Sequence, residues 1–247
     1  NQTGYIDKES LPTLGTVSRN ENGYPIGYFF GYKAIGVFQT QEEIDSYISP
    51  ATGKPIQPNA APGDTKFEDL NGDGVISDDN EDRTMIGKPN PDWMVGLTVA
   101  ADWNGFDLSA FFQGSFGADV FDALRRYELA AVNYTSDALE RWTGPGTSNS
   151  MPRIVLGDTP KNFRPSTLLV HDASFLRLRN LQVGYTLPAQ LTRKAYIQRL
   201  RFYASFDNLL TITGYKGMDP EIGSTMGIDK GVYPQARVYT FGLNLTF

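Results

Sequence analysis

One stretch of the sequence decides the fold, and it reads WMVGLTVAADWNGFDLSAFFQGSF over residues 93–116. Apolar residues occupy alternate positions on both sides of Asn104-Gly105, a dipeptide typical of tight hairpin turns. This alternation predicts a long β-hairpin with one apolar face. The residues on that face are Trp93, Val95, Leu97, Val99, Ala101, Trp103, Phe106, Leu108, Ala110, Phe112 and Phe116.

Similar alternation predicts three further strands, over residues 199–209, 236–247 and 174–187. The last of these is irregular, because Leu176 and Leu178 lie out of phase with the apolar residues that follow them. A β-bulge near Arg179-Asn180, or a strand that rises beyond a bilayer, would explain the change of phase. Residues 27–38 are a weaker sixth candidate for a strand.

The lengths of the connections favour an outer-membrane barrel over a soluble sandwich, which shows the same periodicity. Counting strands back from Phe247 places the short links, Asn104-Gly105 and residues 188–198, at one end. The long segments 117–173 and 210–235, and the chain before Trp93, fall at the other end. Short periplasmic turns and long extracellular loops are typical of such barrels. Trp93 and Trp103, at opposite ends of one strand, suit their two aromatic girdles.

Composition excludes several classes of function. The net charge of -6 disfavours nucleic acid as a partner. The absence of cysteine excludes disulfides and thiolate chemistry, and His171 is the one histidine around which a catalytic triad could form. No acidic pair stands in a recognisable glycosidase setting, so we predict that the chain is not an enzyme. We also expect no signal peptide at Asn1 and no helical membrane span.

An acidic loop, DLNGDGVISDDNED over residues 69–82, resembles a calcium-binding loop. Oxygen ligands at alternate positions followed by a glycine suit a hard cation. The twelfth position is Asn80 rather than an acid, so the closing ligand must come from a longer loop, and Asp79, Glu81 and Asp82 are the alternatives. We predict a structural Ca²⁺ held by Asp69, Asn71, Asp73, the Val75 carbonyl and Asp82; a metal-free acidic turn is the alternative.

Several segments together resemble the C-terminal portion of the SusC/RagA family of TonB-dependent outer-membrane transporters. They are GYFFGYKAIGVFQTQEEID (27–45), PGDTKFEDLNGDGVI (62–76), DRTMIGKPNPDW (82–93), DASFLRLRNLQVGYTLP (172–188), LRFYASFDNLLTITGYKGMDPE (200–221) and ARVYTFGLNLTF (236–247). The resemblance covers most of residues 27–247. In such proteins the Asp of an Asp-Arg pair, here Asp82-Arg83, commonly closes the calcium-like loop.

The resemblance implies an all-β fold, in which the chain supplies the C-terminal antiparallel strands of a transmembrane β-barrel of roughly 22 strands. Six strands are too few to close a bacterial barrel, whose smallest examples have about 8 strands. The partners implied are therefore outer-membrane lipid and the remaining N-terminal barrel and plug part, which this chain lacks. The other implied partners are a SusD-like surface lipoprotein, TonB acting through the missing part, and an oligosaccharide or peptide substrate. The implied location is the outer membrane of a Gram-negative bacterium of Bacteroidota type.

The expected organisation has two parts. Residues 1–92 form an extracellular loop region with one possible strand (27–38) and the calcium-like loop (69–82). Residues 93–247 carry the barrel strands and the extracellular loops 117–173 and 210–235. The predicted function is import of bulky nutrients; a soluble carbohydrate-binding β-sandwich with a structural calcium is the alternative.

The sequence also supports predictions about individual side chains in the loops. Four aromatic residues are candidates for stacking on sugar rings, although loop aromatics more often pack the loop itself: Tyr127, Tyr134, Trp142 and Tyr215. Four acidic residues are expected to be solvated: Asp119, Asp122, Asp137 and Glu140. Short helices are expected at Arg125-Arg126 and over residues 137–142.

Overall fold

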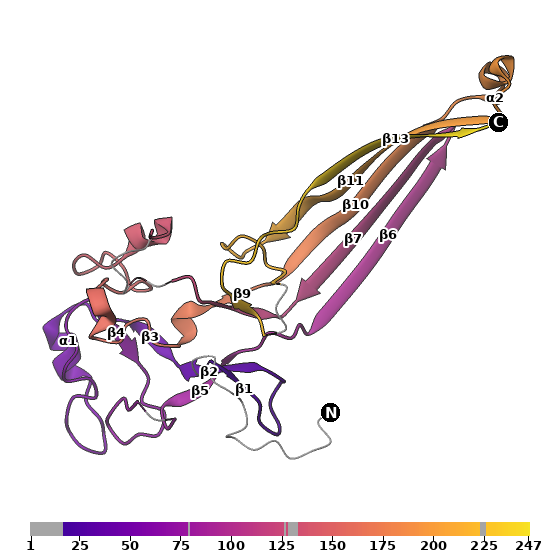
Figure 1. Cartoon of the computed structure of the whole chain (residues 1–247). Helices are drawn as coiled ribbons and strands as arrows, with labels where there is room; N and C mark the ends of the chain where they lie inside the picture. The colour runs from indigo at the N-terminus through magenta and orange to yellow at the C-terminus, as the bar shows by residue number, and fades with distance from the viewer. Residues whose placement is uncertain (1–16, 79, 126, 128–132, 223–225) are drawn as a thin grey trace. The chain divides into compact units, whose positions relative to one another are not determined.

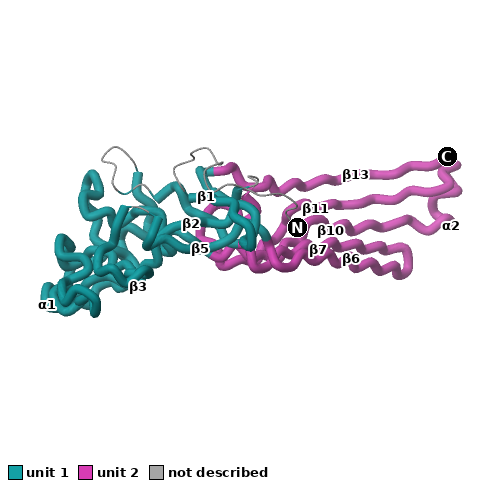
Figure 2. Tube along the Cα trace, turned by 90° about the horizontal axis from the view of Figure 1, so that it is seen from below, with its two compact units in different colours: residues 1–90, 119–171, 223–231 teal, residues 91–118, 172–222, 232–247 magenta. Residues whose placement is uncertain are grey.

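The computed structural model describes residues 17–78, 80–125, 127, 133–222 and 226–247. The chain divides into two compact units, shown in Figure 2. Unit 1 comprises residues 1–90, 119–171 and 223–231, and unit 2 comprises residues 91–118, 172–222 and 232–247. Asn1 and Arg126 lie outside the described residues, as does Asp79 in the acidic loop.

Unit 2 is built on one antiparallel five-stranded sheet, visible as the long ribbons of Figure 1. The strands lie in the order β13-β11-β10-β7-β6. Their bounds are β6 (Trp93–Trp103), β7 (Phe106–Phe116), β10 (Phe175–Thr186), β11 (Arg199–Thr213) and β13 (Val238–Thr246). All five strands were predicted from the alternation of side chains, and β11 extends four residues beyond the predicted end at residue 209.

The pairing register places the apolar residues of neighbouring strands side by side on one face, which we call the apolar face. Trp103 pairs with Phe106, Phe106 with Tyr185, and Tyr185 with Phe202, so four aromatic residues form a row across four strands. At the opposite end of β6, Trp93 pairs with Phe116. Trp93 and Trp103 are 73% and 76% exposed, so in this unit the apolar face is not a protein core.

The predicted bulge is present in β10. Leu178 pairs with Phe112 and Asn180 pairs with Phe111. These two partners are consecutive in β7, so Arg179 is one extra residue in β10. The extra residue reverses the phase of the strand, because side chains alternate between faces with a period of two. Leu176 and Leu178 therefore lie on the apolar face, and Arg177 lies on the opposite, polar face.

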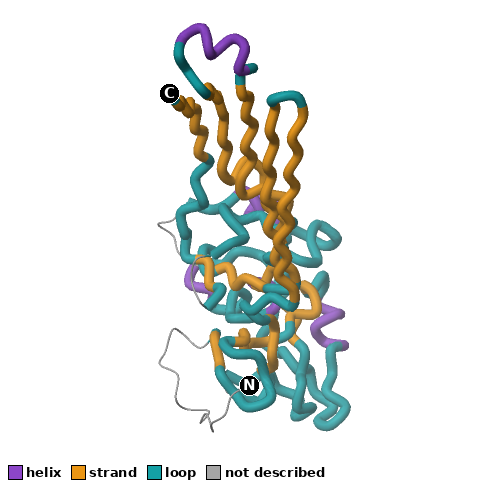
Figure 3. The backbone as a smooth tube through the Cα atoms, turned by 90° about the vertical axis from the view of Figure 1, so that its right-hand side faces the viewer, coloured by secondary structure: helices purple, strands orange, loops and turns teal. Residues whose placement is uncertain are grey.

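Both short connections lie at one end of the sheet, as the parity of the strands predicts (Figure 1, Figure 3). Asn104 and Gly105 have φ angles of 49° and 88°, which a two-residue hairpin turn requires. The other turn contains α2 (Ala189–Thr192) and η4 (Arg193–Ala195). The long connections, which link β7 to β10 and β11 to β13, leave the sheet at the other end.

Unit 1 consists of short strands and helical turns around a small core. Its strands form three small sheets, with the orders β1-β2-β5, β3-β4 and β12-β8-β9. They are β1 (Ser18–Arg19), β2 (Tyr28–Tyr32), β3 (Ala34–Val37), β4 (Thr65–Phe67), β5 (Arg83–Gly87), β8 (Asp119–Asp122), β9 (Val170–Asp172) and β12 (Ile228–Asp229). The helices are α1 (Gln41–Ser46), η1 (Ser136–Glu140), η2 (Leu156–Asp158) and η3 (Thr167–Leu169).

The core of unit 1 joins segments that are distant in the sequence. It contains Val17, Phe29, Phe121, Tyr127, Ala138, Met151, Phe163, Leu169 and Ile228. At the start of α1, Thr40 Oγ1 accepts a hydrogen bond from the Glu43 N–H, while a Glu43 carboxylate oxygen accepts one from the Gln39 N–H. This is a capping arrangement at a helix N-terminus. No helix among the described residues is long and apolar enough to cross a membrane.

Unit 1 differs from two of the expectations. Residues 27–38 form two strands, β2 and β3, in separate small sheets, rather than one sixth strand of the large sheet. Their side chains are mostly buried, Phe29 completely, since this segment packs into the core of unit 1. Segments 1–92 and 117–173 are not plain loops, because they supply most of the strands of unit 1. The short helix expected over residues 137–142 is present as η1, whereas Arg125 is not helical and Arg126 lies outside the described residues.

Deletion of Arg179 tests the role of the bulge. Without the extra residue, strict alternation would turn Leu176 and Leu178 toward the polar face and Arg177 toward the apolar face. We expect the full-length protein that carries this deletion to fail to fold, measured as loss of the heat-modifiable folded band on electrophoresis.

The substitution Arg179→Ala is the matched control, since it removes the guanidinium group but keeps the extra residue. It should retain the folded band. A deletion variant that folds as well as Arg179→Ala would show that the phase reversal is unnecessary.

Candidate functional site

The polar face of the sheet carries hydrogen-bonding and charged side chains in the middle of the strands. Arg201 on β11 donates to both carboxylate oxygens of Asp107 on β7, at 2.8 and 2.5 Å. The pair spans β10 above Gly184, where a Cβ atom would lie 2.5 Å from Arg201 Nη2 and from Asp107 Oδ1. The glycine therefore leaves room for an ion pair that crosses three strands.

Four charged residues form a second group on the polar face, which we call the clamp: Arg177, Arg179, Asp219 and Glu221. Arg177 is only 2% exposed and donates to Asp219 at 2.5 Å and to Glu221 at 3.1 Å. Arg179 donates to both Glu221 carboxylate oxygens, at 2.5 and 2.6 Å. Charge-assisted, multiply bonded arginine–carboxylate pairs are among the strong polar interactions in proteins.

The clamp fixes the loop that follows β11 onto the polar face. Asp219 accepts hydrogen bonds from the N–H groups of Gln235 and Glu221, both at 2.9 Å. Arg179 also donates to Gln113 of β7 and to Asn208 of β11, and Asn208 donates to the Ala236 carbonyl. Both the beginning and the end of the segment 214–237 are therefore held against the sheet.

Asp219 is ionised in this arrangement. Burial raises the pKa of its carboxyl group, but the hydrogen bonds from Gln235, Arg177 and Glu221 outweigh burial and hold the pKa below the ordinary value of 3.8. A carboxyl group whose folded-state pKa is depressed stabilises the fold at pH values above its unfolded pKa. This contribution is lost as the pH falls from about 3.8 through the lower folded-state value.

The acidic loop of unit 1 is organised by its own side chains. The two carboxylate oxygens of Asp69 accept the N–H groups of Gly72 and Gly74, at 2.8 and 2.9 Å. Asn71 Nδ2 lies between two carboxylates, 2.9 Å from Asp73 Oδ2 and 3.0 Å from Glu81 Oε2. The amide thus occupies the space between two negative groups, where a cation would also be stabilised.

Asp82 closes the acidic loop from inside the unit. It is fully buried, and its two oxygens accept the N–H groups of Leu70 and Ser77 at 3.2 and 2.9 Å. Val75, whose carbonyl was predicted to be a ligand, is 56% exposed. In the described part of the chain, no three His, Cys, Asp or Glu side chains form a group that could hold a metal ion. The predicted calcium ligands are not limited to these residue types, because they include the Asn71 amide oxygen and the Val75 carbonyl oxygen.

The aromatic residues proposed for sugar stacking mostly pack the loops. Tyr127 and Tyr215 are 2% and 8% exposed. The Tyr127 hydroxyl donates to Asp137 at 2.7 Å, and the Tyr134 ring packs edge-on against Tyr127 at 5.5 Å. Trp142 donates to Gln39 and its ring lies where a side chain on Gly63 would be. These contacts favour a structural role.

Three of the four acidic residues expected to be solvated have protein partners, which corrects that expectation. Asp122 and Asp137 both form ion pairs with Arg125, at 3.1 and 2.9 Å. Asp119 accepts the Lys88 N–H at 3.0 Å. Glu140 is exposed, as expected. Asp122 lies only three residues before Arg125, whereas Asp119 meets the N–H of Lys88, 31 residues earlier in the chain.

The clamp was missed in the sequence, although one signal was present. Residues 173–206 contain six basic residues and no acidic residue. Cations inside a strand need anionic partners from elsewhere when they are buried. The two partners of Arg177 lie in the loop between β11 and β13, and nothing in their local sequence distinguishes them from solvated acids.

Replacement of Arg177 by methionine tests the clamp. The change leaves Asp219 largely buried without its closest cation, which typically costs about 3–5 kcal/mol. In the full-length protein we expect amide hydrogen exchange in residues 214–222 to accelerate at least a hundredfold.

Arg201→Met is the matched control, because it breaks an arginine–aspartate pair on the same face without touching the loop. Exchange in residues 214–222 should be unchanged in this variant. Equal acceleration in both variants would mean that the loop responds to general weakening of the sheet.

Comparison with known proteins identifies relatives along almost the whole chain, although no family model matches. The sequence is 34% identical over 236 residues to TonB-dependent receptor P3 of Formosa agariphila, a match that covers 91% of this chain and 22% of the relative. It is 30% identical over 248 residues to TonB-dependent receptor SusC of Bacteroides thetaiotaomicron, covering 99% of this chain and 23% of the relative.

The structure resembles part of the RagAB peptide transporter, with a TM-score of 0.72 and 28% identity over 96% of this chain and 24% of that one. The chain thus spans about a quarter of the length of the relatives it matches. These relatives are receptors and transporters rather than enzymes, which confirms the prediction that the chain is not an enzyme. The chain belongs to the SusC/RagA family of TonB-dependent receptors.

Proposed function

We propose that the chain is the C-terminal part of the wall of a TonB-dependent outer-membrane transporter that imports a bulky nutrient, an oligosaccharide or a peptide. The observation that carries this proposal is the exposed apolar face of unit 2, which has aromatic residues at both ends. Lipid-facing surfaces of outer-membrane barrels consist of an apolar band between two aromatic girdles. β6, which joins Trp93 to Trp103, has 11 residues. A tilted transmembrane strand needs about 9–11 residues.

The edges of the sheet support completion by more of the same barrel. Among the described strands, β6 and β13 each pair on one side only, with β7 and β11. Their free edges expose rows of backbone N–H and C=O groups, each of which costs several kcal/mol when left unsatisfied in hydrocarbon. The N-terminal strands of the longer protein would pair with both edges, and its plug would fill the enclosed space.

In this proposal the polar face lines the route of the nutrient. The Arg201–Asp107 pair, Arg179 and Glu221 present charged and hydrogen-bonding groups to that route, and no covalent chemistry is required of them. The clamped residues at the beginning and end of segment 214–237 would restrict the extracellular entrance. A SusD-like lipoprotein would deliver the nutrient, and TonB would act through the part of the protein that precedes this chain.

The soluble β-sandwich is the weaker alternative. A sandwich buries the apolar face of one sheet against a second sheet. In unit 2 the apolar side chains of β6 and β13 are exposed, with Phe241 at 76% and Leu243 at 59%. A row of exposed large apolar side chains on neighbouring strands is not typical of soluble monomers.

We also propose a structural Ca²⁺ at the acidic loop, held by Asp69, Asn71, Asp73, the Val75 carbonyl and Asp82. The donor set fits the ion, because these groups supply carboxylate, amide and carbonyl oxygens, which hard cations prefer. The placement of the Asn71 amide between Asp73 and Glu81 supports the presence of a site that favours positive charge. A bound ion would neutralise these acids and stiffen the loop.

Quenching of tryptophan fluorescence by brominated lipids tests the position of the sheet in a membrane. The chain has three tryptophans, and two of them lie on the apolar face. In the full-length protein in bilayers, brominated acyl chains should quench the fluorescence of Trp93 and Trp103. The contribution of each tryptophan is measured by replacing it with phenylalanine. Trp142→Phe is the control and should leave the quenched fraction unaltered. Absence of quenching at Trp93 and Trp103 would exclude a lipid-facing sheet.

Uptake by cells tests the transport function. A strain that lacks the full-length gene should lose growth on one class of bulky nutrient, either an oligosaccharide or a peptide, offered as the sole source. A strain that lacks TonB should show the same loss on that nutrient and normal growth on its monomer. Growth of both strains on every oligosaccharide and peptide offered would contradict the proposal.

Removal of calcium tests the acidic loop. Chelation should accelerate amide hydrogen exchange in residues 69–82 of the full-length protein, and Asp73→Asn should have the same effect without chelation. Asp78→Asn is the control, because Asp78 pairs with Lys161 and lies outside the proposed ligands. Exchange that is insensitive to both chelation and Asp73→Asn would remove the calcium proposal.

A further inference from the structure

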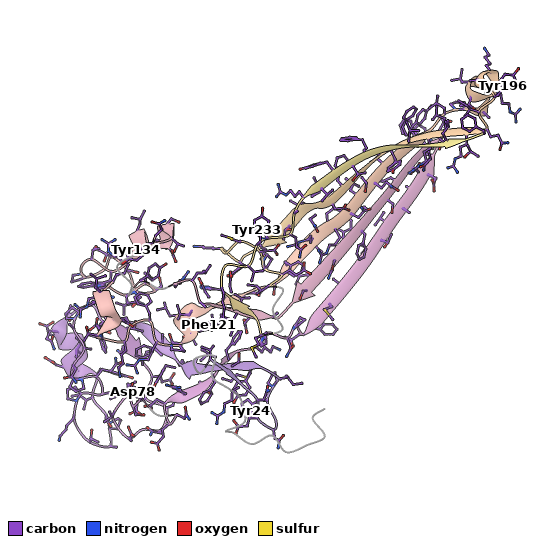
Figure 4. All side chains as sticks on the ribbon, in the orientation of Figure 1. Tyr24, Asp78, Phe121, Tyr134, Tyr196 and Tyr233 are labelled. Carbon is purple, nitrogen blue, oxygen red and sulfur yellow. The ribbon has the colours of Figure 1, made fainter. Side chains whose placement is uncertain are left out.

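The turn between β10 and β11, residues 188–198, has an unusual surface for a connection at the short-turn end of the sheet. Leu191 and Tyr196 are 59% and 91% exposed, and Arg193 and Lys194 are also exposed. Figure 4 shows Tyr196 on this turn, beyond the ends of the strands. Among the described residues, the side chains of Arg193 and Lys194 form no hydrogen bond or ion pair.

These cations differ from the three arginines that are paired on the polar face. Arg177, Arg179 and Arg201 are each paired with carboxylates on the polar face. The turn, in contrast, contains no acidic residue, and the nearest acids along the chain are Asp172 and Asp207. Its two charges are therefore not neutralised by the turn itself, in a chain whose net charge is -6.

The type of side chain on the apolar face changes along the strands, and the turn continues this change. The middle of the sheet presents aliphatic side chains such as Leu97 and Val99. The aromatic row that includes Trp103 and Phe106 follows at the short-turn end. The turn lies beyond the strands at the same end of the sheet (Figure 3), and it carries Arg193 and Lys194. Hydrocarbon, an interface that favours aromatic side chains, and anionic phosphates follow one another in the same order at a bilayer surface.

We propose that residues 188–198 dock onto phospholipid headgroups, with Arg193 and Lys194 binding phosphate oxygens and Leu191 and Tyr196 inserting beside them. Long basic side chains keep their stems on apolar surface while the charged ends reach the phosphates. The short helical turn itself is not the binding element; its role is to present the four side chains together. The proposal rests on the membrane position of the sheet proposed above.

Photo-crosslinking in cells identifies the partner. The full-length protein carries p-benzoylphenylalanine in place of Tyr196, and the adducts are identified by mass spectrometry. A phospholipid adduct is expected. An adduct to a periplasmic or membrane protein, or no adduct, would overturn the proposal.

The charge dependence is measured in vesicles of phosphatidylcholine with a minor fraction of brominated phosphatidylglycerol. A Tyr196→Trp reporter should be quenched more strongly than with the same fraction of brominated phosphatidylcholine. Each cation near a membrane surface changes the apparent affinity for anionic lipid about fivefold. Arg193→Gln with Lys194→Gln should therefore reduce the preference about twenty-five-fold, and the conservative change Arg193→Lys should retain it.

Lys216→Gln is the matched control, because Lys216 is an exposed cation on the connection at the opposite end of the sheet. It should leave the lipid preference of the reporter unchanged. A preference that survives the double substitution would overturn the headgroup proposal. Quenching of Trp93 and Trp103 separates the two proposals: if it is normal while Tyr196 yields no lipid adduct, only the docking of the turn fails.

Discussion

The exposed apolar face of the five-stranded sheet is the constraint on which the rest of unit 2 depends. Full burial of a large apolar side chain stabilises a fold by about 1.5–3 kcal/mol relative to exposure. Residues such as Trp93, Leu97, Phe241 and Leu243 are more than half exposed. Summed over five strands, the cost of leaving this face in water would rival the roughly 5–15 kcal/mol by which a whole domain is stable. The sheet therefore requires an apolar environment outside the chain.

The same constraint explains why the polar side chains are paired as they are. In the proposed position one face lies in an apolar medium, so the charges of the strands must lie on the opposite face, and each buried charge there needs a partner. The Arg201–Asp107 pair satisfies this requirement within the sheet. Arg177 satisfies it with Asp219, which holds that part of the loop between β11 and β13 against the sheet.

Much of unit 2 could be predicted from the sequence, because a period of two is a strong signal in long strands. The hairpin at Asn104-Gly105, all five strands and the bulge near Arg179 follow from the order of residues alone. The aromatic row could not be derived so simply, since Phe202 and Tyr185 join Trp103 only through the registers of separate strand pairs. The resemblance to the family indicated the function class, and the relatives confirm the family.

Unit 1 could not be predicted in the same way. Its strands are two to five residues long, too short for periodicity to distinguish them from turns. Its core joins Phe29, Phe121 and Ile228, which are separated by about a hundred residues at each step. Long-range contacts also decide whether an acidic residue is solvated or paired, as for Asp119, which accepts the N–H of Lys88, 31 residues earlier in the chain. The calcium ligands remain a proposal because the loop is organised by hydrogen bonds that serve an ion-free turn equally well.

The bulge at Arg179 couples two properties that would otherwise change independently during evolution. Arg177 faces the loop only because one extra residue follows it in β10, and Arg179 itself binds Glu221. A lineage that loses this residue loses the anchoring of segment 214–237 as well. Insertions and deletions in the middle of β10 should therefore accompany changes in the length and acidity of a loop more than thirty residues downstream.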